Sequence, residues 1–419
     1  MTKIKPLIQL REMIAAALSS MTNLSKTFEK FFIDTMQLFL TSSGRMNFTQ
    51  MARCSSSCES RFRQNFKKPF DWLSFNRHFL SPMMGHRIAI GIDPCFIPKA
   101  GKKTPGVDWF WSGCAGAIKR GLEILGLSIV DADAKDAVFL KAEQTFTSKV
   151  RGRKPKCTKG MDDPDSLTGW YLRMLSRISR QLLSICHLIV ADAYFSKESF
   201  VTGVKTLGFN IISRFRDDVN LKYLYRGPKT KKRGRPQKFA GKVDLKHLDM
   251  DIFKEEYSVD DKLVYKLYTA EVWAVSLGRE VRVVIVDYLD ADKKTQARKV
   301  FFSTDLTLSA RDIFDLYRTR FQLEFVFRDA KQFTGLTHCQ ARNKEALAFA
   351  FNASLSSVNG ARAYARQQGH NLSVGATKTL LHNAAMVDRF IAMSAKHANL
   401  RLNNTDFKEL LFYGVRAVA

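Results

Sequence analysis

Two apolar runs that each lead into an aspartate constrain the fold of this chain most strongly. The segment 88–92 alternates isoleucine with alanine or glycine, a period of two that marks a β-strand, and is followed by Asp93. The uninterrupted run 188–191, Leu-Ile-Val-Ala, is typical of a strand buried on both faces and is followed by Asp192. Since 170–183 has helical spacing, the pattern predicts an α/β fold in which two strands each end at a carboxylate.

The segments around these strands divide the chain into helical and β-rich regions. Helical spacing predicts helices near both ends, whereas β-branched and aromatic residues predict strands after a strongly basic stretch at 222–242. The predicted helices are 14–18, 28–40, 345–365 and 374–395, and the predicted strands are 122–130, 210–214, 265–275, 279–288 and 298–303. We therefore expect a helical domain at 1–85, an α/β core at 86–215 and 304–365, a β-rich insertion at 216–303 and a helical C-terminal region at 366–419.

The charge balance is strongly basic. Lysine and arginine number 67 against 40 aspartates and glutamates, which gives a net charge of +27 and indicates a polyanionic partner. Nucleic acid, an anionic membrane surface and ribosomal particles would each meet that charge. A membrane is the weakest of these, because no stretch approaches the ~18 uninterrupted apolar residues of a spanning helix. We expect a cytosolic protein.

A helix-turn-helix candidate lies in the N-terminal region. Segment 47–53 is followed by small polar residues and then by a second short helical pattern at 59–66. The second segment carries Arg61 and Arg63, which are of a type that reaches phosphates and base edges in the major groove. A helical hairpin inside an ordinary bundle has the same pattern, so both interpretations remain open.

Basic residues at other places are candidates for DNA contacts. Lys99, Lys102 and Lys103 follow the first aspartate closely and could line a DNA path. Arg233 and Arg235 stand in an Arg-Gly-Arg-Pro run, and 151–155 contains a second Arg-Gly-Arg core, similar to motifs that enter the minor groove of A·T-rich DNA. A solvated loop that binds phosphate without sequence preference is the favoured alternative.

One long helix is expected from about 310 to 333. Ser309 and Asp312 fit a capping box, and Gly335 stands where a helix would end. The phenylalanines of this segment, at 314, 321, 325 and 327, are expected to pack into the core.

A polar stripe runs along this predicted helix. At about 100° per residue, Tyr317, Arg320, Glu324 and Lys331 fall within roughly 60° of one another. The solvated side of an amphipathic helix would show the same spacing, so periodicity alone leaves the role of the stripe open.

Three carboxylates have the chemistry for work on phosphodiesters. That reaction needs an activated water or 3′-hydroxyl, a stabilised leaving oxygen and neutralised phosphate charge, all of which a two-metal site supplies. Mg²⁺ takes oxygen ligands, and Asp93, Asp192 and Glu324 could provide them if a folded sheet brought them together. A strand-terminal aspartate is also common as a turn or helix-capping residue.

The helix residues carry a specific resemblance. Tyr317-x-x-Arg320-x-x-x-Glu324-x-x-x-x-x-x-Lys331 matches the Y-x-x-R-x-x-x-E-x-x-x-x-x-x-K signature at all four positions, and the chain thereby resembles DDE transposases of the insertion sequence four family. The similarity extends to the two strands that precede aspartates, the β-rich insertion and the helical N-terminus, and covers most of the chain.

This resemblance implies an RNase H-like catalytic core, interrupted by the β-rich insertion, in which Asp93, Asp192 and Glu324 bind Mg²⁺. Two ions are implied, for which Mn²⁺ can substitute. Tyr317, Arg320 and Lys331 would contact phosphates of the transposon end. Some members also place a Trp of the insertion against a flipped base; Trp273 is the only one there, and a buried strand position is its favoured reading.

The family resemblance also implies a reaction and its partners. Members cut and paste DNA: water frees a 3′-hydroxyl, that hydroxyl forms a hairpin, the hairpin is reopened, and the end joins target DNA. We therefore expect double-stranded DNA as partner, at transposon ends and target, a homodimer on DNA, and a place at the bacterial nucleoid. The alternative function is a sequence-specific DNA-binding protein or regulator, derived from a transposase, whose catalytic centre is inactive.

Overall fold

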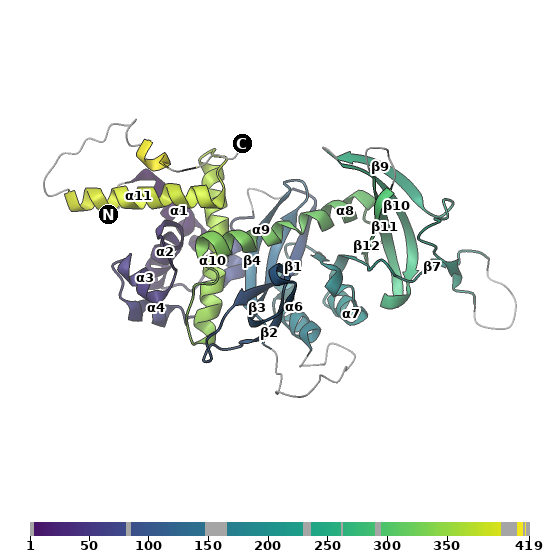
Figure 1. The fold of residues 1–419 in the computed structure, drawn as a ribbon, viewed down its shortest axis with the longest axis horizontal. Helices are drawn as coiled ribbons and strands as arrows, with labels where there is room; N and C mark the ends of the chain where they lie inside the picture. Colours follow the sequence, from purple (N-terminus) through teal and green to yellow (C-terminus); the bar gives the residue numbers. More distant parts are fainter. Residues whose placement is uncertain are drawn as a thin grey trace.

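The computed structural model describes residues 4–80, 85–146, 166–228, 236–260, 263–289, 295–394, 409–413 and 415. The molecule is elongated, with a helical block at one end, a β-rich part at the other and a mixed sheet between them (Figure 1).

The helical block combines residues from both ends of the chain. Side-chain caps start several of its helices; the Ser25 hydroxyl and the Asn47 and Asp71 side chains each accept from the backbone N–H three residues on. Phenyl rings fill the core, among them Phe32 and Phe70, stacked with centroids 4.3 Å apart. The helices are α1 (Lys5–Ser19), α2 (Lys26–Thr41), α3 (Phe48–Arg53), α4 (Glu59–Asn65), α5 (Trp72–Arg77), α10 (Lys344–Gln367) and α11 (Val374–Ser394). The predicted helices of both ends, including the two of the helix-turn-helix candidate, are confirmed as helices.

One sheet contains all the strands of the described residues. Its strands are β1 (Ile88–Pro98), β2 (Asp108–Ser112), β3 (Ala117–Asp131), β4 (Asp136–Gln144), β5 (Leu188–Ala191), β6 (Asn210–Arg214), β7 (Leu221–Leu224), β8 (Phe239–Lys242), β9 (Lys254–Asp260), β10 (Leu263–Ala274), β11 (Arg279–Leu289) and β12 (Thr295–Ser303). Their order is β2-β3-β1-β5-β6-β12-β11-β10-β7-β8, with β4 on β3 and β9 on β10. β1, β5 and β6 are parallel, and the other pairs are antiparallel.

Two features of the sheet differ from the sequence prediction. β12 pairs with β6, so the strands predicted as an insertion continue the central sheet. β1 does not end at Asp93 but runs on to Pro98, because β3 pairs with it along its whole length. The pairing with β5 stops at Ile92, and Pro94 is tolerated where β1 has become an edge on that side.

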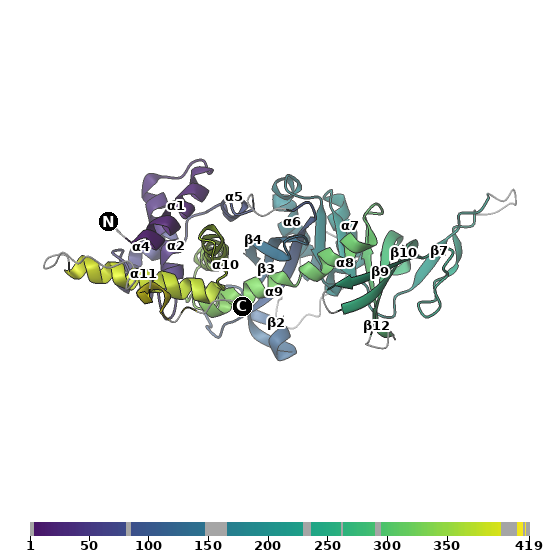
Figure 2. The same cartoon turned by 90° about the horizontal axis from the view of Figure 1, so that it is seen from above.

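Helices cover the two faces of the sheet. α6 (Leu167–Leu183) and α7 (Glu198–Thr206) lie on one side, and α8 (Ala310–Thr319) and α9 (Gln322–Asp329) on the other, as the view from above shows (Figure 2). α8 packs on β3, β5, β6 and β10–β12, and α9 packs on β1, β3 and β4. The pair therefore crosses the sheet from its β-rich end to the helical block.

The single long helix predicted from about 310 to 333 is wrong in detail. Its start is confirmed by the Ser309 hydroxyl, which accepts from the Asp312 N–H, and its end by Gly335 at φ +76°. Between them the helix is interrupted at Arg320 and Phe321, where the backbone donors of residues 321, 323 and 324 bond three residues back. Phe321 is 49% exposed at this break and packs against Phe325, whereas the sequence predicts it in the core.

The free edge of β4 is capped by asparagine side chains of α10. Asn352 bonds the backbone N–H and C=O of Ala142, and Asn359 does the same for Phe139, so each amide replaces a strand partner. Asn359 also donates to the buried Asn76 side chain. These bonds satisfy an edge that is buried beneath the helical block.

Among the described residues, no helix is long and apolar enough to cross a membrane.

Candidate active site

Asp93 and Asp192 stand side by side on neighbouring parallel strands. Ile92 of β1 is level with Ala191 of β5 in the last paired position, and each aspartate is the next residue along its strand. Asp192 also caps the short 3₁₀ turn Ala193–Phe195, because its Oδ1 accepts from the Tyr194 N–H at 3.0 Å. The capping role expected as an alternative for this aspartate is therefore real and coexists with its place beside Asp93.

Arg320 links the first aspartate to Glu324. Its Nη1 donates to Asp93 Oδ1 and its Nη2 to Glu324 Oε1, both at 3.2 Å. The side chains of Arg320 and Asp93 are 11% and 14% exposed, whereas that of Glu324 is 42% exposed. The interruption between α8 and α9 lies at Arg320 itself, which places this guanidinium between a strand carboxylate and a helix carboxylate.

Two glycines allow α9 to lie close enough for this contact. A Cβ on Gly91 of β1 would lie 2.9 Å from Leu323 Cδ1, and one on Gly126 of β3 would lie 2.5 Å from Phe327 Cζ. Both distances are too short for non-bonded carbon atoms, so any side chain there would push the helix away.

The electrostatics of the site disfavour ionised aspartates. Burial raises the pKa of Asp93 to about 7; the Arg320 charge opposes this, while Asp192 and Glu324 add to it. The pKa of Asp192 is raised as well, chiefly by burial, and is lowered in part by Arg320 and by the Tyr194 N–H. A cation among these carboxylates relieves their repulsion, and in this structure that cation is a guanidinium.

Glu123 is a buried carboxylate near the site that the sequence analysis missed. It lies on β3 and accepts from the Tyr171 hydroxyl of α6 at 2.6 Å and from the Thr145 hydroxyl at 2.9 Å. Burial raises its pKa despite these two bonds, and its charge contributes to the raised pKa of Asp93. An acid inside the apolar run Leu-Glu-Ile-Leu at 122–125 is the signal that could have revealed it.

Of the remaining signature residues, Tyr317 lies between β12 and Arg320, and Lys331 lies near β1. Tyr317 is half-buried with its ring 4.8 Å from Phe301, and the Arg320 guanidinium is 5.9 Å from the Tyr317 ring centroid. Lys331 lies near the Cys95 thiol and lowers its pKa, although burial raises that pKa to about 11 overall. The predicted stripe thus lies beside the aspartates, with Arg320 largely buried and Glu324 partly exposed.

The donor set of the site is of the kind that binds a divalent metal. Three carboxylates are the chemistry that Mg²⁺ takes. Within the described ranges, however, no three Asp, Glu, His or Cys side chains stand close enough to hold an ion together. Arg320 holds Glu324 to one side of Asp93. The residues fit the ion in kind, but two of the three carboxylates are paired with Arg320 in this structure.

A basic pocket of about 910 Å³ lies where β1 ends. Arg63 of α4, Lys99, Lys102 and Lys103 line it, together with Arg342, which the predicted site did not include. Among the described residues that line this pocket, none is acidic. The structure thus brings Arg63 to the two lysines, whereas Arg61 is not among the lining residues and lies over the Phe31 ring. Arg233, Arg235 and the motif at 151–155 fall outside the described residues.

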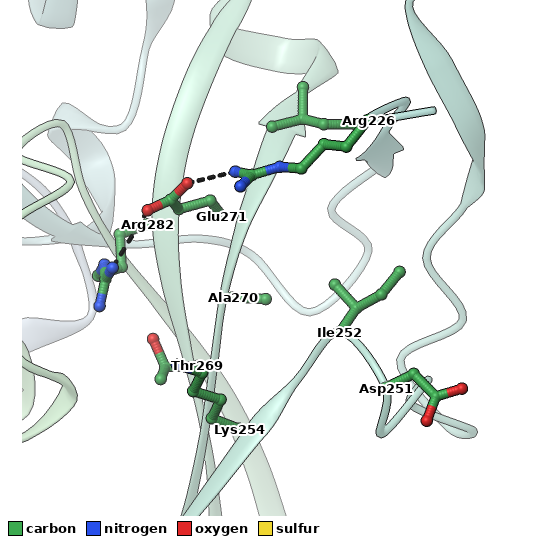
Figure 3. Close-up of a pocket in the computed structure, with 9 residues that line it drawn as sticks. Arg226, Asp251, Ile252, Lys254, Thr269, Ala270, Glu271 and Arg282 are labelled. Carbon is green, nitrogen blue, oxygen red and sulfur yellow. Dashed lines mark hydrogen bonds and ion pairs between the residues drawn. The ribbon is translucent and has the colours of Figure 1, made fainter. Parts of the chain in front are cut away.

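The β-rich part has a separate pocket of about 380 Å³, whose lining includes the acids Asp251 and Glu271 (Figure 3). Glu271 points between Arg226 and Arg282 and is paired with both. Trp273 on the same strand is half-buried, packs on Phe239, and has the Lys238 ammonium 3.4 Å from its ring centroid. These contacts agree with the reading of Trp273 as a packed strand residue.

Sequence comparisons with known protein families find two matches that together cover most of the chain. A family model described as DDE superfamily endonuclease matches residues 37–254, and one described as transposase DDE domain matches residues 172–359. Together they span all three carboxylates. The cryo-EM structure of a piggyBac transposase synaptic complex with hairpin DNA matches at a TM-score of 0.40 and 12% identity, over 100% of this chain and 84% of that one, a likeness too low to support a conclusion. None of the curated proteins matches the sequence. The chain belongs to the DDE superfamily endonucleases and carries a transposase DDE domain.

Proposed function

We propose that this protein is a cut-and-paste transposase that hydrolyses and joins DNA strands with Asp93, Asp192 and Glu324 as its metal-binding carboxylates. The observation that carries the proposal is the meeting of the three regions, since Asp93 and Asp192 follow the last paired residues of two parallel strands and Arg320 joins Asp93 to Glu324. Structural ion pairs also perturb pKa values, so the geometry and not the raised pKa of Asp93 supports the assignment.

The catalytic core in this proposal is RNase H-like and consists of β4-β3-β1-β5-β6 with α6 and α7. Its supporting observation is the change from antiparallel to parallel pairing at β1, which places Asp93 and Asp192 together. The DNA-binding domain in this proposal is 1–85. The core consists of 86–215 and 304–365, with the insertion 216–303 between them, and 366–419 is the C-terminal region.

Mg²⁺, with Mn²⁺ as a substitute, would be held by Asp93, Asp192 and Glu324. Two such ions would activate a water or 3′-hydroxyl and stabilise the leaving oxygen of the scissile phosphate. Arg320 would stabilise the buried charge of Asp93 until a phosphate binds the guanidinium, since the two donors that now bond Asp93 and Glu324 can bind one phosphate together.

The other basic residues would bind the DNA around the cut. Tyr317 and Lys331 flank the carboxylates and suit the phosphates of the transposon end. Arg63, Lys102 and Lys103 suit a more distant stretch of the duplex, because they share the basic pocket. We assign Arg61, Arg233 and Arg235 to further phosphate contacts. The same proposal includes the hairpin intermediate, a homodimer on DNA, membership of the insertion sequence four family and a bacterial nucleoid setting.

Strand cleavage tests this proposal directly. A plasmid that carries the gene with its native flanking DNA is incubated with the protein and Mg²⁺, and nicks at the element ends are mapped. Glu324→Gln should abolish nicking and leave DNA binding intact, while Glu12→Gln, an exposed matched change on α1, should nick as the wild type does. Equal nicking by Glu324→Gln and wild type would overturn the assignment.

A DNA-binding regulator with an inactive centre is the second candidate. The specific observation in its favour is that Arg320 occupies two of the three carboxylates. In that case the protein binds the same ends, and neither Mg²⁺ nor Mn²⁺ produces nicks.

A further inference from the structure

The hairpin formed by β2 and β3 exposes large apolar side chains on one face. Trp109, Trp111 and Ile118 are 60%, 61% and 62% exposed. Among the ring and cation–π contacts of the described residues, none involves either of these indoles. Exposed indoles two residues apart on a strand are a costly surface unless something stacks on them.

This face continues the face of the sheet that carries the carboxylate site. β1 and β3 pair without a register shift from Asp93↔Gly126 to Pro98↔Gly121, and β2 then pairs Trp109 with Arg120 and Trp111 with Ile118. Since side chains alternate along β3, Gly126, Arg120 and Ile118 point to the same side, and Gly126 faces α9. The indoles therefore lie on the side of Asp93 and Arg320.

The hairpin emerges where the covering helices stop. Leu122 and Ile124, between the site and the tip, are fully buried, and exposure begins at Arg120. β2 stands out from the body of the protein on the side of α9 (Figure 2). From Gly126 to Arg120 is about 20 Å of strand, and to Ile118 about 27 Å, equivalent to roughly six to eight nucleotides along duplex DNA.

The charge around the hairpin identifies the occupant. Residues 99–120 contain five basic side chains and one acidic one, and the basic pocket with Lys102 and Lys103 begins at Pro98, opposite the base of the hairpin. A second copy of this chain is a poor occupant, because two such basic surfaces on chains of net charge +27 repel. DNA combines phosphates for the cations with flat bases for the indoles.

We propose that Trp109 and Trp111 stack on unpaired bases of the DNA about six to eight nucleotides from the scissile phosphate. In an intact duplex the bases are stacked on each other, so the occupant is a locally opened stretch. The two residues are about 7 Å apart along the strand, twice the ~3.4 Å spacing of stacked bases, which leaves room for one base between the indoles. The inference rests on DNA being the substrate in the proposed function, but not on catalysis.

The test compares two DNA probes without metal, so that cleavage plays no part. One is a fully paired duplex, and the other is the same duplex with a short run of unpaired thymines. Binding is followed by fluorescence anisotropy of the DNA and by quenching of the protein's tryptophan emission. Wild type should prefer the opened probe, and Trp109→Ala and Trp111→Ala should each weaken binding to it by about fivefold or more. Binding to the paired duplex should change less than about twofold.

Two control variants test whether the preference for the opened probe depends on an aromatic ring at the hairpin. Trp111→Phe should retain most of the preference because a phenyl ring still stacks, and Phe390→Ala, an equally exposed aromatic of α11, should leave both affinities unchanged. Equal affinities of wild type and Trp111→Ala for the opened probe would overturn the inference. It would also be overturned if the Trp variants kept their preference for the opened probe and changed from dimer to monomer in sedimentation. Tryptophan-dependent binding without nicking in Mg²⁺ would instead sink the proposed function and leave this inference standing.

Discussion

Arg320 and Asp93 form a buried ion pair across 227 positions of sequence, with Nη1 3.2 Å from Oδ1. The same guanidinium reaches Glu324, while its Nε is buried without a partner. Arg320 therefore has one buried donor without an acceptor and binds two of the three carboxylates. Such an arginine can release them when a phosphate, which accepts more hydrogen bonds, binds the guanidinium. The pair therefore connects the stability of the site with its proposed chemistry.

Replacing Arg320 by methionine should cost stability in a pH-dependent way. The change leaves Asp93 buried and unpaired, and we expect a loss of about 3 kcal/mol in the free energy of unfolding at pH 8. The loss should shrink at pH 5, where Asp93 is protonated in the folded protein. Denaturant unfolding at both pH values measures it. Arg328→Met, which removes a more exposed guanidinium of α9, should change stability by less than about 1 kcal/mol at either pH. Equal losses for the two variants would contradict the burial argument.

The pKa of Asp93 predicts how stability varies with pH. Because that pKa is about 7 in the folded protein against an ordinary value of 3.8, the folded state binds a proton between about pH 4 and pH 7 that the unfolded state does not. The contribution of Asp93 to stability is complete below pH 4 and is lost as the pH rises through 7. Asp93→Asn should therefore be more stable than wild type at pH 8 and no more stable at pH 4. A stability difference that does not vary with pH would show that the carboxyl is not buried as described.

Mg²⁺ binding should release a proton for the same reason. An Asp93 that is about half protonated near pH 7 must lose its proton to become a ligand. Titration calorimetry in buffers of different ionisation enthalpy should detect this release at pH 6.5, and Asp93→Asn should abolish it. Binding heats that do not depend on the buffer would count against Asp93 as a ligand.

Gly126→Ala should displace α9. The new methyl group would lie 2.5 Å from Phe327 Cζ, and overpacking of this kind costs about 1–3 kcal/mol. Combining it with Phe327→Leu should recover part of that loss, so the double variant should be more stable than the sum of the single changes predicts. Additive losses would place the helix farther from β3 than the structure has it.

Asn359→Leu should destabilise the edge strand β4. The substitution leaves the backbone N–H and C=O of Phe139 and the side-chain oxygen Oδ1 of Asn76 without their partner, for an expected loss of at least about 3 kcal/mol. Hydrogen exchange at the Phe139 amide should accelerate along with the loss of stability. Asn383→Leu, a change on α11 away from the sheet, serves as the comparison. An unchanged exchange rate at Phe139 would mean that the edge is satisfied in another way.

Local pattern predicted much of this structure. The runs before Asp93 and Asp192, the strand Asn210–Arg214, the Ser309 cap and the Gly335 stop lie where the sequence placed them. Each depends on neighbours within a few residues, such as the alternation of a strand or a hydroxyl three positions before an N–H.

Features that depend on distant partners were not predictable in the same way. The extension of β1 past Asp93 depends on β3, and the union of insertion and core depends on the pairing of β12 with β6. The Arg320–Asp93 pair and the buried Glu123–Tyr171 bond each require tertiary placement that no spacing records. Phe321 was assigned to the core from periodicity, but the break at Arg320 turns its ring outward.

Exchange of a metal ligand tests the central claim most directly. Mg²⁺ requires oxygen ligands, whereas a transition-metal ion such as Mn²⁺ tolerates a thiolate sulfur. Nicking of the element ends by Asp192→Cys is measured with each ion, beside Asp218→Cys, an exposed aspartate away from the carboxylates. The account predicts that Asp192→Cys is inactive with Mg²⁺ and partly active with Mn²⁺, while Asp218→Cys matches wild type with both. Full activity of Asp192→Cys with Mg²⁺ would contradict it.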